Sequence, residues 1–347
     1  MSKLKIAIIC GGKSSEHEIS CVSANGILNA LDRAQFEPVL IGITKNGRWL
    51  LLPSDTNFAI INGALPVVPE SGVEINVTSQ GLFSGGKNLE IDVAFPILHG
   101  PYGEDGTIQG LLEMIGIKYV GSGVLASAVC MDKSYAKPIF ASAGLNVAPG
   151  IVVTSKDFEL PSTLKLPLFV KPARSGSSRG TTKVKELTQL VGAVEHALDF
   201  DTKVIIEQAI VGKEIECAVL QADDKITVSK VGQILISDKF EFYDFQAKYL
   251  DDSMQLILPA DLPEEASRQI QQAALIAFEA AGCEGLARVD FFYSSEGKVI
   301  INEINTMPGF TPMSVYPKLI ENSGINYQLL ITKLIQTAKN RSSSITR

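Results

Sequence analysis

The sequence has few cysteines and histidines and no long apolar run. Its 347 residues include five cysteines and three histidines, which are widely spaced and form no Cys-x-x-Cys pair. This spacing argues against a structural zinc site and a disulfide framework, and it favours a reducing compartment. No stretch approaches the ~18 apolar residues of a membrane-spanning helix, and the N-terminus lacks the apolar core of a signal peptide. We therefore expect a cytoplasmic protein without a membrane partner.

An excess of positive charge is also absent. The chain has 31 Lys and Arg against 38 Asp and Glu, a formal net charge of −7. A nucleic-acid binder needs a basic face to displace counterions from phosphates, so we expect no nucleic-acid partner. Lysines concentrated in one cleft would still suit a nucleotide substrate. The length predicts two or three domains, at ~100–200 residues each.

Alternating strands and helices in the first third predict a parallel α/β sheet with helices on both faces. Short apolar runs predict its strands at Leu4–Cys10, Pro38–Ile43, Ile91–Leu98 and Lys118–Val120. Helical spacing predicts helices at 20–31, with Ser20 as the N-cap, and at 107–115. Residues 50–90 are rich in turns, and we expect them to form an insertion with small strands.

The pattern changes near residue 122. One long helix is predicted at Leu125–Ala143, with a kink at Pro138, before a small α+β unit that includes a helix at Leu187–Leu198. A second α+β unit follows, with a long helix at Pro263–Cys283, a hairpin and two C-terminal helices. The predicted domains are 1–121, 122–207 and 208–347.

The hairpin carries the most specific chemical pattern. A two-residue turn at Glu296-Gly297 would place Asp290 opposite Glu303 and Arg288 opposite Asn305. Side chains two apart on a strand share a face, so these four would lie together. Facing carboxylates repel, and a divalent cation would remove that cost. Carboxylate and amide oxygens suit Mg²⁺. The alternative is a solvated sheet face whose charges are balanced by arginine.

A loop rich in glycine and serine follows a predicted strand at Lys171–Gly180. Small residues let backbone N–H groups approach a phosphate closely, and Lys171 can add a point charge. The loop lacks the Walker pattern G-x-x-x-x-G-K-[ST]. It could therefore bind phosphate or be an ordinary surface turn.

Two further glycine-rich loops follow strands of the first sheet, where α/β proteins bind ligands. Residues 11–20 open a helix, and Glu16 could hold a substrate ammonium or favour the helix dipole. In residues 99–110, His99 could line a site or be a core histidine. Glu104 and Asp105 could cap the next helix.

Taken together, the motifs resemble the D-alanine–D-alanine ligase family of the ATP-grasp superfamily over nearly the whole chain. The matching segments are GGKSSEHEIS (11–20), HGPYGEDGTIQG (99–110), GSGVLASAVCMDK (121–133), VKPARSGSSRG (170–180), FYDFQAKY (242–249), ARVDFF (287–292) and NEINTMPGFTPMS (302–314). The resemblance implies a three-domain α/β ATP-grasp ligase. Its N-terminal domain would have a parallel, Rossmann-like sheet, and two α+β domains would enclose ATP.

The resemblance also implies the roles of individual residues. The ATP contacts would be Lys133, Lys171, Ser178, Glu207, Glu214 and Lys248. The metal ligands would be Asp290, Glu303 and Asn305, holding two Mg²⁺ or Mn²⁺ ions. The D-alanine contacts would be Glu16, which holds the first ammonium, His99, Ser314 and Val315. The catalytic groups would be a Glu16–Ser177–Tyr249 triad and an oxyanion hole formed by Arg288 and the Gly309 N–H.

The implied activity joins two D-alanines through an acyl phosphate, for peptidoglycan precursors, in an enzyme expected to be a homodimer. One alternative is a ligase that makes D-alanyl-D-lactate or D-alanyl-D-serine. Family members that make the lactate ester lack the tyrosine found here as Tyr249, which favours the dipeptide. A dinucleotide-dependent oxidoreductase is suggested only by the opening strand–glycine–helix unit, and G-x-G-x-x-G is missing.

Overall fold

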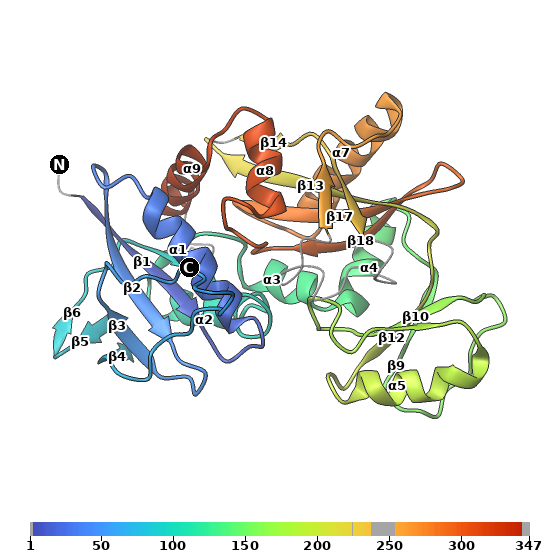
Figure 1. Cartoon of the computed structure of the whole chain (residues 1–347), viewed down its shortest axis with the longest axis horizontal. Coiled ribbons are helices and arrows are strands. Elements are labelled where there is room, and N and C mark those ends of the chain that lie inside the picture. The colour runs from blue at the N-terminus through green and yellow to red at the C-terminus, as the bar shows by residue number, and fades with distance from the viewer. Residues whose placement is uncertain (1–2, 224, 237–253, 342–347) are drawn as a thin grey trace.

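Three β-sheets organise the chain. The structure, a computed structural model, describes residues 3–223, 225–236 and 254–341. In chain order the sheets have eight, four and six strands. Figure 1 shows the first sheet at the left end of the molecule, the second at the lower right and the third above and between them. Within the described ranges, no helix has the length and apolar character needed to cross a membrane.

The first sheet is parallel at its centre and antiparallel at one side. Its order is β6-β5-β4-β3-β2-β1-β7-β8, and β2, β1, β7 and β8 are parallel neighbours. The bounds are β1 Leu4–Gly11, β2 Phe36–Ile43, β3 Trp49–Leu52, β4 Val73–Thr78, β5 Gly81–Ser84, β6 Lys87–Asn88, β7 Val93–Pro96 and β8 Lys118–Tyr119. The expected parallel sheet is therefore confirmed at its centre. The expectation for residues 50–90 is also confirmed, because this insertion adds small antiparallel strands.

Helices from both ends of the chain cover this sheet. They are α1 (His17–Ala30), α2 (Thr107–Met114) and, from the C-terminus, α9 (Tyr327–Asn340). One apolar cluster combines strand residues such as Ile6 and Ile8 with Leu330 and Leu334 of α9. The last helix is therefore part of the first sheet's core.

Two predicted helix details are wrong. Ser20 is not an N-cap, because α1 begins three residues earlier; the buried Ser20 Oγ donates to Ile97 O and accepts from Gly11 N at 2.8 Å. The predicted helix at 125–143 is two helices, α3 (Val124–Met131) and α4 (Lys133–Ser142). The break lies at Asp132, which is extended and caps α4 through Ser134 N, while Pro138 lies inside α4.

The second sheet has the order β11-β10-β12-β9 and is antiparallel throughout. Its strands are β9 Gly150–Val153, β10 Leu168–Pro172, β11 Thr182–Val184 and β12 Val204–Gln208. The short 3-10 helix η1 (Leu187–Gln189) leads into α5 (Leu190–Leu198), where one continuous helix was predicted. Buried residues of α5, such as Val194, pack on one face of the sheet.

The third sheet has the order β16-β15-β13-β17-β18, with β14 paired to β13. The bounds are β13 Gly212–Ala222, β14 Lys225–Val228, β15 Gly232–Ile236, β16 Met254–Ile257, β17 Leu286–Ser294 and β18 Val299–Asn305. It packs against α7 (Glu264–Ala280) and α8 (Val315–Asn322). All five cysteines are free and buried.

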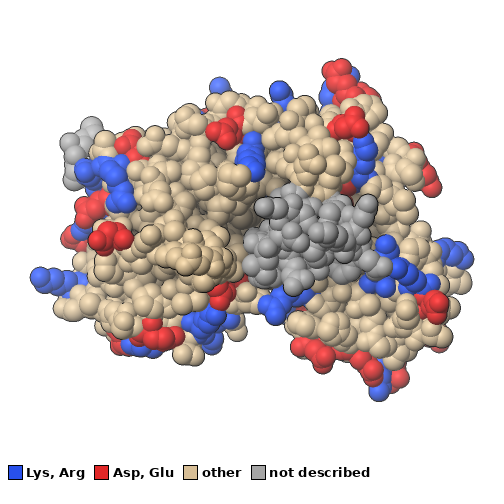
Figure 2. Space-filling model, in the orientation of Figure 1, with Lys and Arg blue, Asp and Glu red and all other residues tan. Residues whose placement is uncertain are grey.

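The surface carries both signs of charge. On the face shown in Figure 2, Lys and Arg side chains are interspersed with Asp and Glu around the rim, and most of the described area is neither. Lys133 is instead buried, and it lines a pocket between the second and third sheets together with Lys171.

Candidate active site

The β17–β18 hairpin has the register predicted from the sequence at the polar positions. Asp290 pairs with Glu303, and Arg288 pairs with Asn305. The predicted two-residue turn is wrong, because Ser294 N donates to Lys298 O at 2.9 Å and encloses three residues. A β-bulge after Asp290 corrects the difference, since the register shifts there by one residue.

The bulge has a chemical consequence. Asn302 is the extra residue, and both it and Glu303 line the same pocket although they are consecutive. Asn302 Oδ1 accepts a long hydrogen bond of 3.4 Å from Lys171 Nζ. Asn302 was not predicted as a site residue, because strict alternation places it on the opposite face.

A first pocket, here called the nucleotide pocket, lies between the second and third sheets. Five of the six residues predicted to contact ATP line it, namely Lys133, Lys171, Ser178, Glu207 and Glu214. The sixth, Lys248, lies outside the described residues. Ser178 has a left-handed backbone with φ 55°, and so does its neighbour Ser177 with φ 51°. The serine-rich loop therefore turns sharply at the pocket wall.

Buried lysines and carboxylates are paired in the nucleotide pocket. Glu207 is 4% exposed and lies 2.7 Å from Lys171 Nζ and 2.6 Å from Lys137 Nζ, the second without hydrogen-bond alignment. Burial raises the pKa of Glu207, but the two ammonium groups outweigh it and lower the pKa to about 2. Lys133 Nζ lies 3.0 Å from Glu303. Lys137 was not predicted from the sequence, although it is one helical turn from Lys133 on α4.

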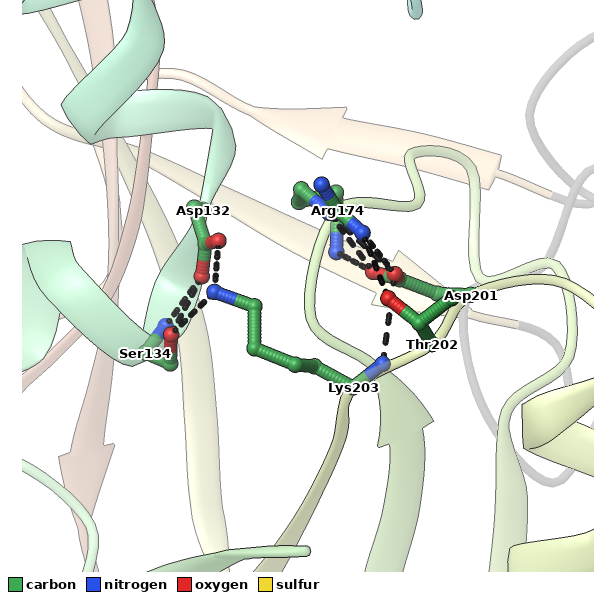
Figure 3. Close-up of polar contacts among 6 residues, drawn as sticks. All are labelled: Asp132, Ser134, Arg174, Asp201, Thr202 and Lys203. Atoms are coloured by element: carbon green, nitrogen blue, oxygen red, sulfur yellow. Dashed lines mark hydrogen bonds and ion pairs between the residues drawn. The ribbon is translucent and has the colours of Figure 1, made fainter. Parts of the chain in front are cut away.

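A polar network fixes the base of the serine-rich loop (Figure 3). Asp132 accepts a hydrogen bond from Ser134 N at 3.0 Å and also receives the Lys203 ammonium. Arg174 Nε donates to the Asp201 carboxylate at 3.1 Å. Lys133 N also donates to the carbonyl of residue 173 at 3.0 Å. The start of α4 and the loop after β10 are thereby held together, which positions the nearby lysines.

A second pocket, here called the substrate pocket, lies where α1 and the glycine-rich loops meet the third sheet. It is lined by all the described residues predicted to contact D-alanine or to act in catalysis: Glu16, His99, Ser177, Arg288, Gly309, Ser314 and Val315. Ser177 Oγ donates to Glu16 Oε1 at 2.6 Å, although the two are 161 residues apart. This contact joins two members of the predicted triad. The third member, Tyr249, lies outside the described residues.

His99 is both a buried histidine and a pocket residue. It is 4% exposed, with Nδ1 3.0 Å from Met307 O and Nε2 3.1 Å from Ser23 Oγ. Burial lowers the pKa of His99, but the Glu104 carboxylate 3.9 Å away outweighs it and the pKa is raised. Glu104 lines the pocket. Asp105, by contrast, contacts the start of α2, because it accepts from Thr107 N at 3.0 Å, although the N-cap residue itself is Gly106.

Arg288 and the candidate metal ligands form one cluster. Arg288 donates through Nε and Nη2 to the two oxygens of Asp290, both at 2.8 Å. Asn305 Nδ2 donates to Asp290 at 3.0 Å. Glu216, which the sequence analysis did not include, lies 3.0 Å from Arg288 Nε. Glu216 could have been found from β13, where it shares a face with Glu214.

The donor set fits Mg²⁺ with help from a substrate. Among the described residues there is no group of three or more His, Cys, Asp or Glu side chains that could hold a metal alone. Asp290 and Glu303 offer two facing carboxylates, and Asn305 offers an amide oxygen. Mg²⁺ is usually held by one or two carboxylates together with substrate phosphates, and the nucleotide pocket adjoins these side chains.

A lysine-lined pocket lies between the two antiparallel sheets and adjoins a substrate pocket at the parallel sheet. This arrangement defines an ATP-dependent ligase of the ATP-grasp class. The chain belongs to the D-alanine–D-alanine ligase family. The family description "D-ala D-ala ligase N-terminus" matches residues 5–122, and "D-ala D-ala ligase C-terminus" matches residues 139–336. The family inferred from the sequence motifs is confirmed.

Individual relatives agree over nearly the full length. A D-alanine–D-alanine ligase of Paenarthrobacter aurescens is 46% identical, covering 98% of this chain and 96% of the relative. One from Mycolicibacterium smegmatis is 47% identical, covering 99% and 97%. Among solved structures, the VanG D-Ala:D-Ser ligase of Enterococcus faecalis has a TM-score of 0.84 at 36% identity, covering 97% of this chain and 100% of that chain. The D-alanine–D-alanine ligase of Coxiella burnetii has 0.83 at 34%, covering 98% and 95%.

Proposed function

We propose that this chain joins two D-alanines into D-alanyl-D-alanine at the expense of ATP, for peptidoglycan precursors. The observation that carries the proposal is that the nucleotide and substrate pockets share Ser177 and Glu303 in their walls. A phosphoryl group bound in one pocket can therefore reach a carboxylate bound in the other. The full-length similarity to D-alanine–D-alanine ligases supports the same substrates.

The proposed reaction has two steps. The carboxylate of the first D-alanine, with its ammonium held by Glu16, attacks the γ-phosphate of ATP and gives an acyl phosphate and ADP. The amine of the second D-alanine, with its carboxylate at Ser314, then attacks the acyl carbon and phosphate leaves. Arg288 and the Gly309 N–H face the oxyanion that forms in this step. Lys133 and Lys171 reduce the repulsion between the anions that meet in the first step.

The proposed metal site is the cluster of Asp290, Glu303 and Asn305. Bound Mg²⁺ or Mn²⁺, as two ions, would neutralise charge on the phosphates. Glu207 and Glu214 would contact the nucleoside part of ATP, and His99 and Val315 would line the D-alanine subsites. Facing carboxylates on neighbouring strands support a cation at this position.

The remaining parts of the proposal come from the sequence. The domains are proposed as 1–121, 122–207 and 208–347, and the three sheets support this division. The homodimer, the cytoplasmic location and the roles of Lys248 and Tyr249 stay predictions. Tyr249 would complete the triad and close the site against water, which would otherwise hydrolyse the acyl phosphate.

The test is phosphate release from ATP and Mg²⁺ with D-alanine, L-alanine or no amino acid, with the product identified by mass. Phosphate and D-alanyl-D-alanine formed only with the D isomer would support the proposal. D-Serine and D-lactate are then offered with D-alanine, because preferred formation of a mixed product would favour the alternative ligases. NAD binding without ATP turnover would favour the oxidoreductase.

A further inference from the structure

Glu216 is a buried carboxylate beside the candidate metal ligands. On β13 it is paired in register with Asp290 of β17, which is itself paired with Glu303 of β18. Three carboxylates therefore form a row across three neighbouring strands, and all three line the nucleotide pocket. Glu216 is 4% exposed. Such a row is stable only when nearby cations offset the repulsion between its members.

Arg288 supplies part of that balance. Its Nε lies 3.0 Å from Glu216 Oε2 and donates to Asp290 Oδ1 at 2.8 Å, while Nη2 donates to Asp290 Oδ2 at 2.8 Å. The guanidinium thus makes a double contact with one carboxylate and a single contact with the other. Arg288 lines the substrate pocket and Glu216 lines the nucleotide pocket. Their ion pair therefore crosses the wall between the two pockets.

Asp290 has donors that compete with a metal ion. It accepts two hydrogen bonds from Arg288 and a third from Asn305, and a carboxylate has about four lone-pair sites. If Asp290 and Asn305 bind Mg²⁺, Arg288 loses part of its contact and gains a cationic neighbour. A carboxylate outside the metal-ligand set can then hold the guanidinium, and Glu216, 3.0 Å from Arg288 Nε, is such a carboxylate among the described residues.

We propose that Glu216 is a positioning residue that keeps Arg288 at the substrate pocket while Asp290 binds the metal. This inference rests on the proposed ligase function, in which Arg288 faces the oxyanion. The role depends on contact between the two side chains and not on negative charge alone. A carboxylate one methylene shorter keeps the charge but does not reach the guanidinium.

The test is metal binding without turnover. Full-length protein with ADP and without D-alanine is titrated with Mn²⁺, and free Mn²⁺ is followed by electron paramagnetic resonance. The proteins are wild type, Glu216→Gln and Glu216→Asp, and the same two changes combined with Arg288→Met. We expect each single change to weaken Mn²⁺ binding ~10-fold, because the Arg288 guanidinium then competes fully for Asp290. In the Arg288→Met background, the same change should alter Mn²⁺ binding less than ~2-fold.

A kinetic readout accompanies the titration. We expect kcat for dipeptide formation to fall ~10-fold in both single variants, with the KM for ATP changed less than ~2-fold. Thermal unfolding with a chelator shows whether each variant folds. If Glu216→Gln does not fold, Glu216→Asp, which keeps the buried charge, provides the test.

Several outcomes would overturn the proposal. Wild-type behaviour of Glu216→Asp beside a loss in Glu216→Gln would mean that charge alone matters. Losses that persist in the Arg288→Met background would mean that Glu216 does not act through the guanidinium. If the wild type binds Mn²⁺ and the single variants bind it equally well, only the role of Glu216 would be refuted. A wild type that binds no Mn²⁺ with ADP would refute the proposed metal site as well.

Discussion

Glu207→Gln should lower the opening free energy of the second sheet, and the surroundings of the carboxylate determine the size of this loss. The carboxylate is 4% exposed and lies within 2.7 Å of two lysine ammonium groups, and its pKa is lowered from 4.5 to about 2. At about 1.4 kcal/mol per pH unit, this difference corresponds to about 3 kcal/mol. That value agrees with the ~3–5 kcal/mol lost when one partner of a buried ion pair is removed. Glutamine keeps the size and removes the charge.

Hydrogen exchange of the β10 and β12 amides measures this effect locally, which suits a chain with several sheets. At pH 7 the opening free energy of these amides should fall by about 3 kcal/mol in Glu207→Gln. The matched control is Glu195→Gln, because that carboxylate is 53% exposed and lies 3.2 Å from Lys156. A surface pair of this kind contributes about 0.5 kcal/mol or less.

The pH dependence gives a second check on the same group. Because the folded pKa of Glu207 is depressed, its contribution is complete above pH 4.5 and is lost as the pH falls toward 2. Wild type should therefore lose more stability over this window than Glu207→Gln does. Equal losses in wild type and Glu207→Gln between pH 4.5 and about 2 would refute the reasoning, and so would a difference from the Glu195→Gln control below about 1 kcal/mol at pH 7.

Three further changes have expected outcomes. Asp290→Asn should lower kcat by about 100-fold or more and should abolish the Mg²⁺ dependence of thermal stabilisation by ADP; retained dependence would exclude it as a ligand. Ser177→Ala removes a 2.6 Å hydrogen bond to a carboxylate and should lower kcat/KM for D-alanine at least ~10-fold, with unfolding temperature unchanged. Gly11→Ala should destabilise the fold by ~2 kcal/mol or more, since its Cβ would lie 2.3 Å from Ile43 O at φ 88°. Gly12→Ala has a similar φ of 94° but a nearest contact of 3.5 Å, so an equal loss there would contradict the steric explanation.

The hairpin shows how far sequence reasoning reaches. The two-residue turn assumed from the sequence placed Asp290 opposite Glu303, and the structure has this pairing. The assumed turn is one residue too short, and the bulge at Asn302 was not foreseen, so two errors cancel at the polar positions. Neither feature follows from local pattern, because the choice between turn types and the place of a bulge depend on how the strands pack.

Other misses have the same origin in contacts between distant segments. The break at Asp132 is stabilised by a hydrogen bond from Lys133 N to the carbonyl of residue 173, in the loop that follows β10. Helical propensity alone favours continuity there. Glu216 was not predicted because its position beside Asp290 depends on the pairing of β13 with β17, which are far apart in sequence. The motifs, by contrast, are contiguous in the chain, and they identified the family. Each described residue that was predicted for the site lines one of the two pockets.

The position of α9 has a consequence for synthesis on the ribosome. The strands of the first sheet are made early, but Leu330 and Leu334, which complete their apolar cover, come from the last helix. Translation is vectorial, so part of the apolar face of the nascent first sheet stays uncovered until nearly the whole chain has been made. A chain that stops before Tyr327 would carry both other sheets and still lack this part of the apolar cover.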